Sequence, residues 1–328
     1  MAFASANPVR CLIVPLLTML AFVACVDDAP TPASTRTPRN SPTPVGAGPL
    51  TPTPFGGAPP PFPFSTPEPR TPYPGVAPGY YSPEGSAPLP ELPEGAAVYL
   101  SLGGSLNYGC CADIQLSSHP RLAHYLSQEL NREVIWVSLA GNGTLQTFLH
   151  GIEGATPQLD NAVSVLNQLQ ADGHDVVLIS LSIGGNDLLV LRDQGCTGGG
   201  NPDCLAAFSD LMNNYTTDMQ TVYAKLNAAK DPATPIFQNT LYDAQNCGQD
   251  NAEITTSAVA IKTYNQRMEG ATRVGGGFLV DFYEPFKGRA CELISGVDPT
   301  YRGYDVILEL DEAMYETLPS EYVDPWRR

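Results

Sequence analysis

Beyond residue 95, the hydrophobic pattern alternates between short apolar runs and longer amphipathic stretches. The uninterrupted apolar runs, bounded by glycine or polar residues, predict buried strands at 97–102, 134–139, 176–181, 236–241 and 277–281. Between them, apolar residues recur at steps of three and four, which predicts helices at 119–130, 159–169, 205–226, 254–268 and 301–318. This alternation is typical of a parallel sheet covered by helices on both faces.

Three glycine-containing turns follow the first three predicted strands. In such sheets ligands sit at the carboxyl ends of the strands, which is where these turns lie. The turns read Gly103-Gly104-Ser105, Gly141-Asn142-Gly143 and Gly184-Gly185-Asn186. Any one of them is explained by the need for glycine in a tight turn. Together they supply a hydroxyl, free backbone N–H groups and a side-chain amide, which favours an acyl-transfer site with an oxyanion hole.

These turns carry a resemblance to the SGNH (GDSL-type) hydrolase family. The matching segments are YLSLGGSLNYG, VSLAGNGTL, LSIGGNDLL and GVDPTYRGYDVI, which together span about 99–307. The resemblance implies a three-layer α/β/α sandwich with a five-stranded parallel sheet, flavodoxin-like in type. It also implies hydrolysis of ester or acyl bonds without metal or other cofactor. By this resemblance Ser105 is the nucleophile, and its N–H, that of Gly143 and the Asn186 side chain form the oxyanion hole.

Two blocks depart from the family pattern. Gly104 stands where the family has aspartate, and in the last block Asp298 and Ser295 stand at the family's histidine and aspartate positions. A histidine suits the role of base because its pKa lies near neutral pH, whereas an exposed aspartate, with a pKa of about 3.9, is a weak base. We therefore expect Asp298 to act as a base only if burial raises its pKa.

None of the four histidines is an obvious replacement for the histidine that the family has at position 298. We expect His119 and His124 at the surface of the first helix, and His174 at the opposite edge of the sheet. His150, which follows the second turn, is the histidine with a route to Ser105. For each of the four, a surface or structural role is the first expectation.

The functional expectation is thus an exported ester or acyl hydrolase with weak or lost activity. The alternative is a non-catalytic surface domain that binds a small acylated or carbohydrate ligand. In either case we expect the protein to be a monomer. A structural spacer or adhesin tip is a third class.

The N-terminal 95 residues predict export and tethering. Residues 11–24 are apolar but shorter than the roughly 20 residues of a membrane span, and they fit a secretory signal. The signal ends in Ala24-Cys25, which resembles a bacterial lipoprotein site with Cys25 as lipid anchor. A plain signal peptide or a short uncleaved anchor remains open. Residues 26–95 hold 21 of the 32 prolines and predict an extended linker, so that 96–328 forms the domain on the outer side of a bacterial membrane.

The net charge limits the classes of binding partner that we expect. The net charge of −17 argues against nucleic acid and against docking on an anionic membrane, which leaves the lipid anchor as the membrane contact.

Six cysteines follow Cys25, which suggests disulfides; Cys196–Cys204 is the favoured pair and the rest stay open. Their spacing shows no zinc pattern. The acidic residues of the last helix are expected on its solvated face: Glu309, Asp311, Glu312 and Glu316.

Overall fold

The sheet is central and parallel. The computed structural model describes residues 80–81, 89, 91–109, 114–141, 143–152, 155–196, 201–248 and 252–327, all within the unit Thr66–Arg328. The main sheet has the order β1-β3-β2-β4-β5-β6, and every neighbouring pair in it is parallel. Its strands are β1 (Tyr80–Tyr81), β2 (Ala97–Gly103), β3 (Val134–Ser138), β4 (Asp175–Ser182), β5 (Ile236–Asn239) and β6 (Phe278–Val280).

The five strands expected from the sequence are β2 to β6, so the predicted sheet is confirmed. Taken in chain order, these five are arranged 2-1-3-4-5, the flavodoxin-like order. In this order the chain reverses its winding at the first and third strands, here β2 and β4. The crevice at the carboxyl ends of those two strands is the general ligand site of such folds.

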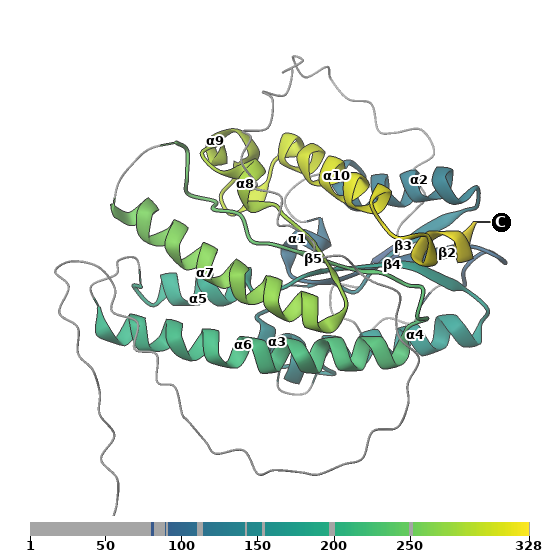
Figure 1. Ribbon diagram of the computed structural model, residues 1–328, viewed down its shortest axis with the longest axis horizontal. Helices are drawn as coiled ribbons and strands as arrows, with labels where there is room; N and C mark the ends of the chain where they lie inside the picture. Colours follow the sequence, from purple (N-terminus) through teal and green to yellow (C-terminus); the bar gives the residue numbers. More distant parts are fainter. Residues whose placement is uncertain are drawn as a thin grey trace, which may run out of the picture. The chain divides into compact units, whose positions relative to one another are not determined.

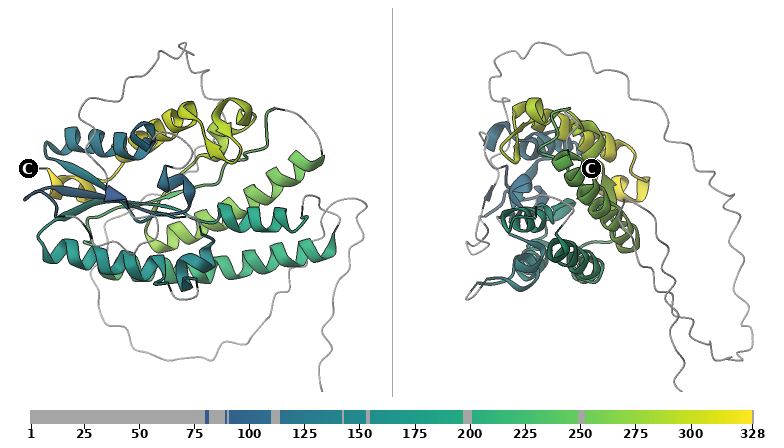
Figure 2. Two further views of the ribbon diagram at one scale, coloured as in Figure 1. Left: turned by 180° about the vertical axis from the view of Figure 1, so that it is seen from behind. Right: turned by 90° about the vertical axis from the view of Figure 1, so that its left-hand side faces the viewer.

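Helices cover both faces of the sheet and complete the three layers (Figure 1). One face is covered by α3 (Leu145–His150), α4 (Gln158–Ala171), α5 (Gly185–Asp193), α6 (Pro202–Ala229) and α7 (Ala252–Gly275). The other carries α1 (Ser105–Tyr108), α2 (Ser118–Leu130), α8 (Tyr283–Phe286), α9 (Ala290–Leu293), α10 (Tyr301–Glu316) and α11 (Ser320–Val323). The two views of Figure 2 show the same division. Within the described ranges, no helix has both the length and the apolar character to cross a membrane.

The strand pattern divides the core into two apolar clusters. Val98 and Leu100 of β2 face the α4–α6 layer, whereas the intervening Tyr99 faces the α2–α10 layer. Both faces of β2 are therefore buried, because side chains alternate across a strand and helices lie on either side. This burial explains why the sequence shows continuous apolar runs there.

Part of the segment expected to be linker is folded. Tyr80–Tyr81 form the edge strand β1, which pairs with Val137 and Ser138 of β3. Leu89 and Leu92 pack against the α4–α6 core, and the carbonyl of Gly95 accepts a hydrogen bond from Arg132. The high proline content concealed this strand, because proline is tolerated in and around edge strands. The earlier residues, including the signal segment and Cys25, lie outside the described part.

The longest helix of the described residues, α6, is longer than the strands of the sheet. At 1.5 Å per residue the 28 residues of α6 reach about 42 Å, whereas the eight residues of β4 reach about 26 Å. Its start is fixed by Asn201, whose side chain accepts from the N–H of Asp203, with Pro202 in the first turn. Figure 1 shows the first half of α6 extending past the strands beside α5. Leu205, placed by periodicity on the buried face, is consequently 42% exposed.

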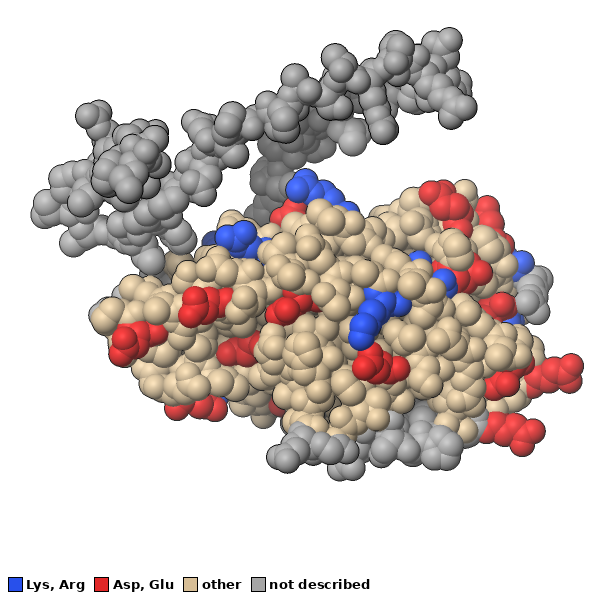
Figure 3. All heavy atoms as spheres, turned by 90° about the horizontal axis from the view of Figure 1, so that it is seen from below, with Lys and Arg blue, Asp and Glu red and all other residues tan. Residues whose placement is uncertain are grey.

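On one face of the domain the acidic side chains are dispersed rather than concentrated. On the face shown in Figure 3, carboxylates are scattered among uncharged side chains, with few lysines and arginines. The expectation that Asp311 lies on a solvated face was wrong, because it is 1% exposed. Neither of its carboxyl oxygens has a hydrogen-bond partner among the described residues. Burial, together with the charge of Glu312, raises the pKa of Asp311 well above its ordinary value.

Asp311 should therefore make stability depend on pH. Because its folded-state pKa is raised, its contribution is fully favourable below about pH 4 and is lost as pH rises towards the folded-state value. Over that range the free energy of unfolding should fall by about 1.4 kcal/mol per pH unit from this group. Asp311→Asn should remove this slope in urea unfolding measured from pH 4 to 8, whereas Glu309→Gln, an exposed acid on the same helix, should leave it unchanged. An unaltered slope in Asp311→Asn would contradict the assignment.

Candidate functional site

The turn after β2 presents Ser105 at the winding reversal. Gly103 has φ +106°, and a Cβ there would lie 2.1 Å from the carbonyl oxygen of Ser182 at the end of β4. Only glycine allows this approach. The next N–H, of Gly104, donates to that same carbonyl at 2.6 Å. The turn is thereby fixed on β4, and Ser105, half-buried, begins α1 at the edge where ligands bind.

Gln158 holds the same turn from the other face. Its Oε1 accepts from the N–H of Gly103 at 2.7 Å, and its Nε2 donates to the carbonyl of Gly103 at 3.2 Å. That carbonyl also accepts from the N–H of Gly141, at 2.9 Å, in the second turn. Gln158 was missed in the sequence because it begins α4, far from any strand end, and no local signal marks its partner.

The second and third turns are joined to each other. Asn186 Nδ2 donates to the carbonyl of Gly143 at 3.0 Å, and the Asp187 carboxylate accepts from the N–H of Leu145 at 2.9 Å. A Cβ on Gly143 would lie 2.4 Å from Thr147 Oγ1, so a side chain there would displace the turn. Burial raises the pKa of Asp187 to about 6, although hydrogen bonds from backbone N–H groups lower it. Asp187 thus anchors the Gly143 turn as well as standing in the first turn of α5.

Asp298 reaches Ser105 from a small hairpin. The hairpin pairs β7 (Ile294–Ser295) with β8 (Asp298–Pro299) in antiparallel fashion, with Ser295 opposite Asp298. Ser105 donates a side-chain hydrogen bond to the half-buried Asp298 carboxylate. Burial raises the pKa of Asp298, and the bond from Ser105 lowers it by a smaller amount. Residues 193 positions apart in the chain are therefore in contact.

The charge of Asp298 also acts on two tyrosines. Burial first, and the negative charge of Asp298 second, raise the pKa values of Tyr242 and Tyr304. Tyr242 also donates to the carbonyl of Val297 at 2.9 Å, next to Asp298. No local pattern in the sequence links either tyrosine to Asp298, since Tyr242 lies in the loop after β5 and Tyr304 in α10.

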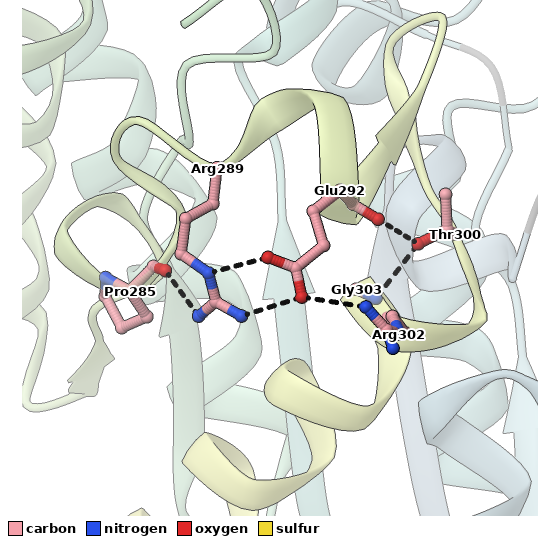
Figure 4. Close-up of polar contacts among 6 residues, drawn as sticks. All are labelled: Pro285, Arg289, Glu292, Thr300, Arg302 and Gly303. Atoms are coloured by element: carbon pink, nitrogen blue, oxygen red, sulfur yellow. Dashed lines mark hydrogen bonds and ion pairs between the residues drawn. The ribbon is translucent and has the colours of Figure 1, made fainter. Parts of the chain in front are cut away.

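A charged cluster supports the hairpin (Figure 4). Glu292 of α9 binds Arg289 at 3.3 Å and Arg302 of α10 at 3.2 Å. The Thr300 hydroxyl donates to the carbonyl of Glu292 at 3.2 Å and accepts from the N–H of Gly303, capping α10. The hairpin is thus held at both ends by neighbouring helices, which fixes where Asp298 stands.

The geometry brings Ser105, Asn186, Gly143 and Asp298 to one end of the sheet, and a family comparison agrees with it. A model of the GDSL-like Lipase/Acylhydrolase family matches residues 101–306, well over half of the chain. The chain belongs to this family. A comparison with curated protein sequences gave no match.

Several solved structures are similar to this GDSL-like chain, and one with a TM-score above 0.5 shows the same fold. The lipase Lip_vut3 from a goat rumen metagenome is 22% identical, with a TM-score of 0.51 over 66% of this chain and 97% of that one. An extracellular lipase from Streptomyces rimosus is 19% identical, with a TM-score of 0.47 over 66% of this chain and 99% of that one. A phospholipase A1 from Streptomyces albidoflavus is 16% identical, with a TM-score of 0.48 over the same shares.

The four histidines of this GDSL-like domain lie on α2, at the end of α3 and just before β4. His150 is exposed. Burial raises the pKa of Asp218 in α6, whereas a hydrogen bond from Gln146 and, to a smaller extent, the nearby His150 lower it. His174 contacts the carbonyl of Ala96 at the amino edge of the sheet, as expected. His124 is half-buried and bonds Gln128. The surface placement of His119 was wrong: it is fully buried beneath α1.

Two disulfides join described segments of the domain. Cys196–Cys204, the favoured pair, links the end of α5 to the start of α6. Cys247–Cys291 links the loop after β5 to α9, next to the hairpin that carries Asp298. Cys110 and Cys111 lie outside the described residues. Both disulfides are consistent with an extracellular location. Across the described ranges, no three His, Cys, Asp or Glu side chains gather in a way that would hold a metal ion.

The two disulfides should differ in their effect on stability. Loop entropy predicts a loss of about 4 kcal/mol for the 44-residue separation of Cys247–Cys291 and about 2.5 kcal/mol for the 8-residue separation of Cys196–Cys204. Urea unfolding of the two double Cys→Ala variants measures both losses. Equal losses, or a larger loss for the short loop, would contradict this account.

Proposed function

We propose that this protein is a serine hydrolase of ester or acyl bonds in which Ser105 is the nucleophile and Asp298 the base. The observation that carries the proposal is the hydrogen bond from the Ser105 side chain to the half-buried Asp298 carboxylate. A serine hydroxyl is a weak nucleophile until a base takes its proton. The hydrogen bond supplies a path for that proton, and burial supplies a stronger base than an exposed aspartate.

The reaction proceeds in two halves. The Ser105 oxygen attacks the acyl carbon while Asp298 accepts its proton, and the carbonyl oxygen becomes an oxyanion. The N–H groups of Ser105 and Gly143 and the side-chain amide of Asn186 stabilise this oxyanion. Its collapse expels the alcohol, which takes the proton from Asp298 and leaves an acyl-serine. Water then attacks this ester, Asp298 accepts the water's proton, and the Ser105 oxygen takes that proton as the carboxylic acid departs.

A carboxylate base sets the expected pH dependence. Asp298 works when deprotonated, and burial raises its pKa. Activity should accordingly be lost on the acid side as Asp298 gains a proton, with a midpoint above the ordinary carboxylate range. Rates should be modest, since even a raised carboxylate is a weaker base than an imidazole at neutral pH.

Labelling of the full chain by a fluorophosphonate, which reacts with an activated serine, tests the proposal. The wild type should be labelled and Ser105→Ala should not. Asp298→Asn should slow labelling by roughly 10²–10⁴-fold, the usual contribution of a general base. Asp298→His should restore labelling, with its acid limb moved towards the imidazole pKa of about 6.5.

Two outcomes would overturn this function. Labelling that persists in Ser105→Ala would show that another residue is the nucleophile. An unlabelled wild type that still binds an acylated or carbohydrate ligand would favour the non-catalytic binding domain instead.

Export and surface anchoring complete the proposal. The apolar residues 11–24, the following Cys25 and the proline-rich segment support a lipid-anchored protein on the outer face of a bacterial membrane. Two disulfides support an oxidising compartment. Expression in a bacterium fed a labelled fatty acid should label the wild type but not Cys25→Ser. Equal incorporation into both would argue against Cys25 as the anchor.

A further inference from the structure

The four-residue helix that begins at Ser105 rests on a polar patch of the sheet. In the register of the strands, Ser101 of β2 stands opposite Ser138 of β3 on one side and Ser180 of β4 on the other. All three serines are buried. A row of serines in the centre of a sheet is unexpected for packing, because leucine or valine would bury more apolar area.

Asn107 of α1 binds this serine row. Its backbone carbonyl accepts from Ser101 Oγ at 3.1 Å and from Ser138 Oγ at 3.3 Å. Its Nδ2 donates to Ser180 Oγ at 3.2 Å and to the carbonyl of Leu102 at 2.8 Å. Asn239 of β5 donates to its Oδ1 at 3.3 Å. Asn107 is itself fully buried, so these bonds replace water that it has lost.

His119 binds the same short helix from α2. Its Nε2 lies 3.0 Å from the carbonyl oxygen of Leu106, the residue after Ser105. Its Nδ1 lies 2.8 Å from the Tyr99 hydroxyl, which in turn lies 2.8 Å from Ser180 Oγ. Trp136 stacks on the imidazole, with ring centres 5.5 Å apart.

The number of protons that each group carries determines which atom donates in each of these hydrogen bonds. The Leu106 carbonyl only accepts, so His119 Nε2 carries the proton and Nδ1 accepts from Tyr99. Tyr99 has then used its one proton, so Ser180 donates to Tyr99 and accepts from Asn107. The result is a closed circuit: Asn107 to Ser180, Tyr99, His119 and back to Leu106. It requires a neutral imidazole, which agrees with the lowering of the His119 pKa to about 4 by burial.

We propose that this buried circuit aims the Ser105 hydroxyl at Asp298, with His119 and Asn107 as positioning residues. An isolated four-residue helix has almost no stability of its own, so contacts with the rest of the protein must set its orientation. The circuit holds α1 through two consecutive residues, Leu106 and Asn107, directly after Ser105. The catalytic consequence rests on the proposed function, whereas the positioning of the hydroxyl does not.

Matched variants of the full chain separate positioning from general destabilisation. His119→Phe removes both ring nitrogens, whereas His119→Gln keeps an N–H for the Leu106 carbonyl. Tyr99→Phe breaks the circuit by one hydroxyl and so provides a milder variant if His119→Phe does not fold. Its control is Tyr315→Phe, which also removes a buried hydroxyl on this face, one without a hydrogen-bond partner among the described residues.

The first measurement is an NMR titration of the Asp298 carboxyl, assigned against Asp298→Asn. The bond from Ser105 lowers the pKa of Asp298, so Ser105→Ala should raise it. His119→Phe and Tyr99→Phe should raise it in the same direction, and His119→Gln and Tyr315→Phe should leave it at the wild-type value. An Asp298 titration unchanged in both circuit variants would overturn the proposal.

The second measurement is the rate of fluorophosphonate labelling, taken below the unfolding temperature of each variant. His119→Phe should slow labelling by roughly 10–100-fold, the effect of misplacing a reacting group by about 1 Å, and His119→Gln should restore most of the rate. If the titration shifts as expected but the wild type is not labelled, the positioning stands and the proposed function fails. Slow labelling without a titration shift would mean a purely structural role for His119 and overturn the positioning.

Discussion

The parallel pairing of β2 with β4 is the constraint on which the site depends. These two strands end level with each other, with Gly103 opposite Ser182. The lack of a side chain on Gly103 allows the two backbones to approach, and the N–H of Gly104 then bonds the Ser182 carbonyl. Ser105 and Asn186 follow these strand ends by a few residues each, so a single strand pairing brings a hydroxyl and an amide to one place. The winding reversal at β2 and β4 leaves that place open to a ligand.

Buried polar groups are treated in two opposite ways on the α2–α10 face. Under α1, Asn107, His119 and the serine row are linked by hydrogen bonds, so burial costs little and the geometry is fixed. In α10, Asp311 is equally buried, yet its carboxyl oxygens have no such partners in the described part of the chain. The first arrangement orders a short helix, whereas the second lowers stability at neutral pH.

Asp298 depends on the other end of the chain. Its hairpin is held by the Glu292 cluster, by the Thr300 cap of α10 and by a disulfide from the neighbouring α9 to the loop after β5. That loop also supplies Tyr242, which binds the hairpin backbone. These contacts are independent of the β2–β4 pairing. The contact between Ser105 and Asp298 therefore depends on how the ends of β2 and β4 pack against the β7–β8 hairpin, and neither segment predicts it alone.

The sequence by itself determined the strands, the main helices, the three glycine turns and the Cys196–Cys204 pair. Each of these follows from local chemistry: a period of two or 3.6, a glycine requirement, or a short loop between cysteines. Only the tertiary structure decided that His119 and Asp311 are buried, that Tyr80–Tyr81 join the sheet, and that Asp298 meets Ser105. Periodicity tells which side chains share a face of a helix, but not what covers that face. For His119 and Asp311 the covering groups come from strands and helices distant in the chain, and no local rule reports them.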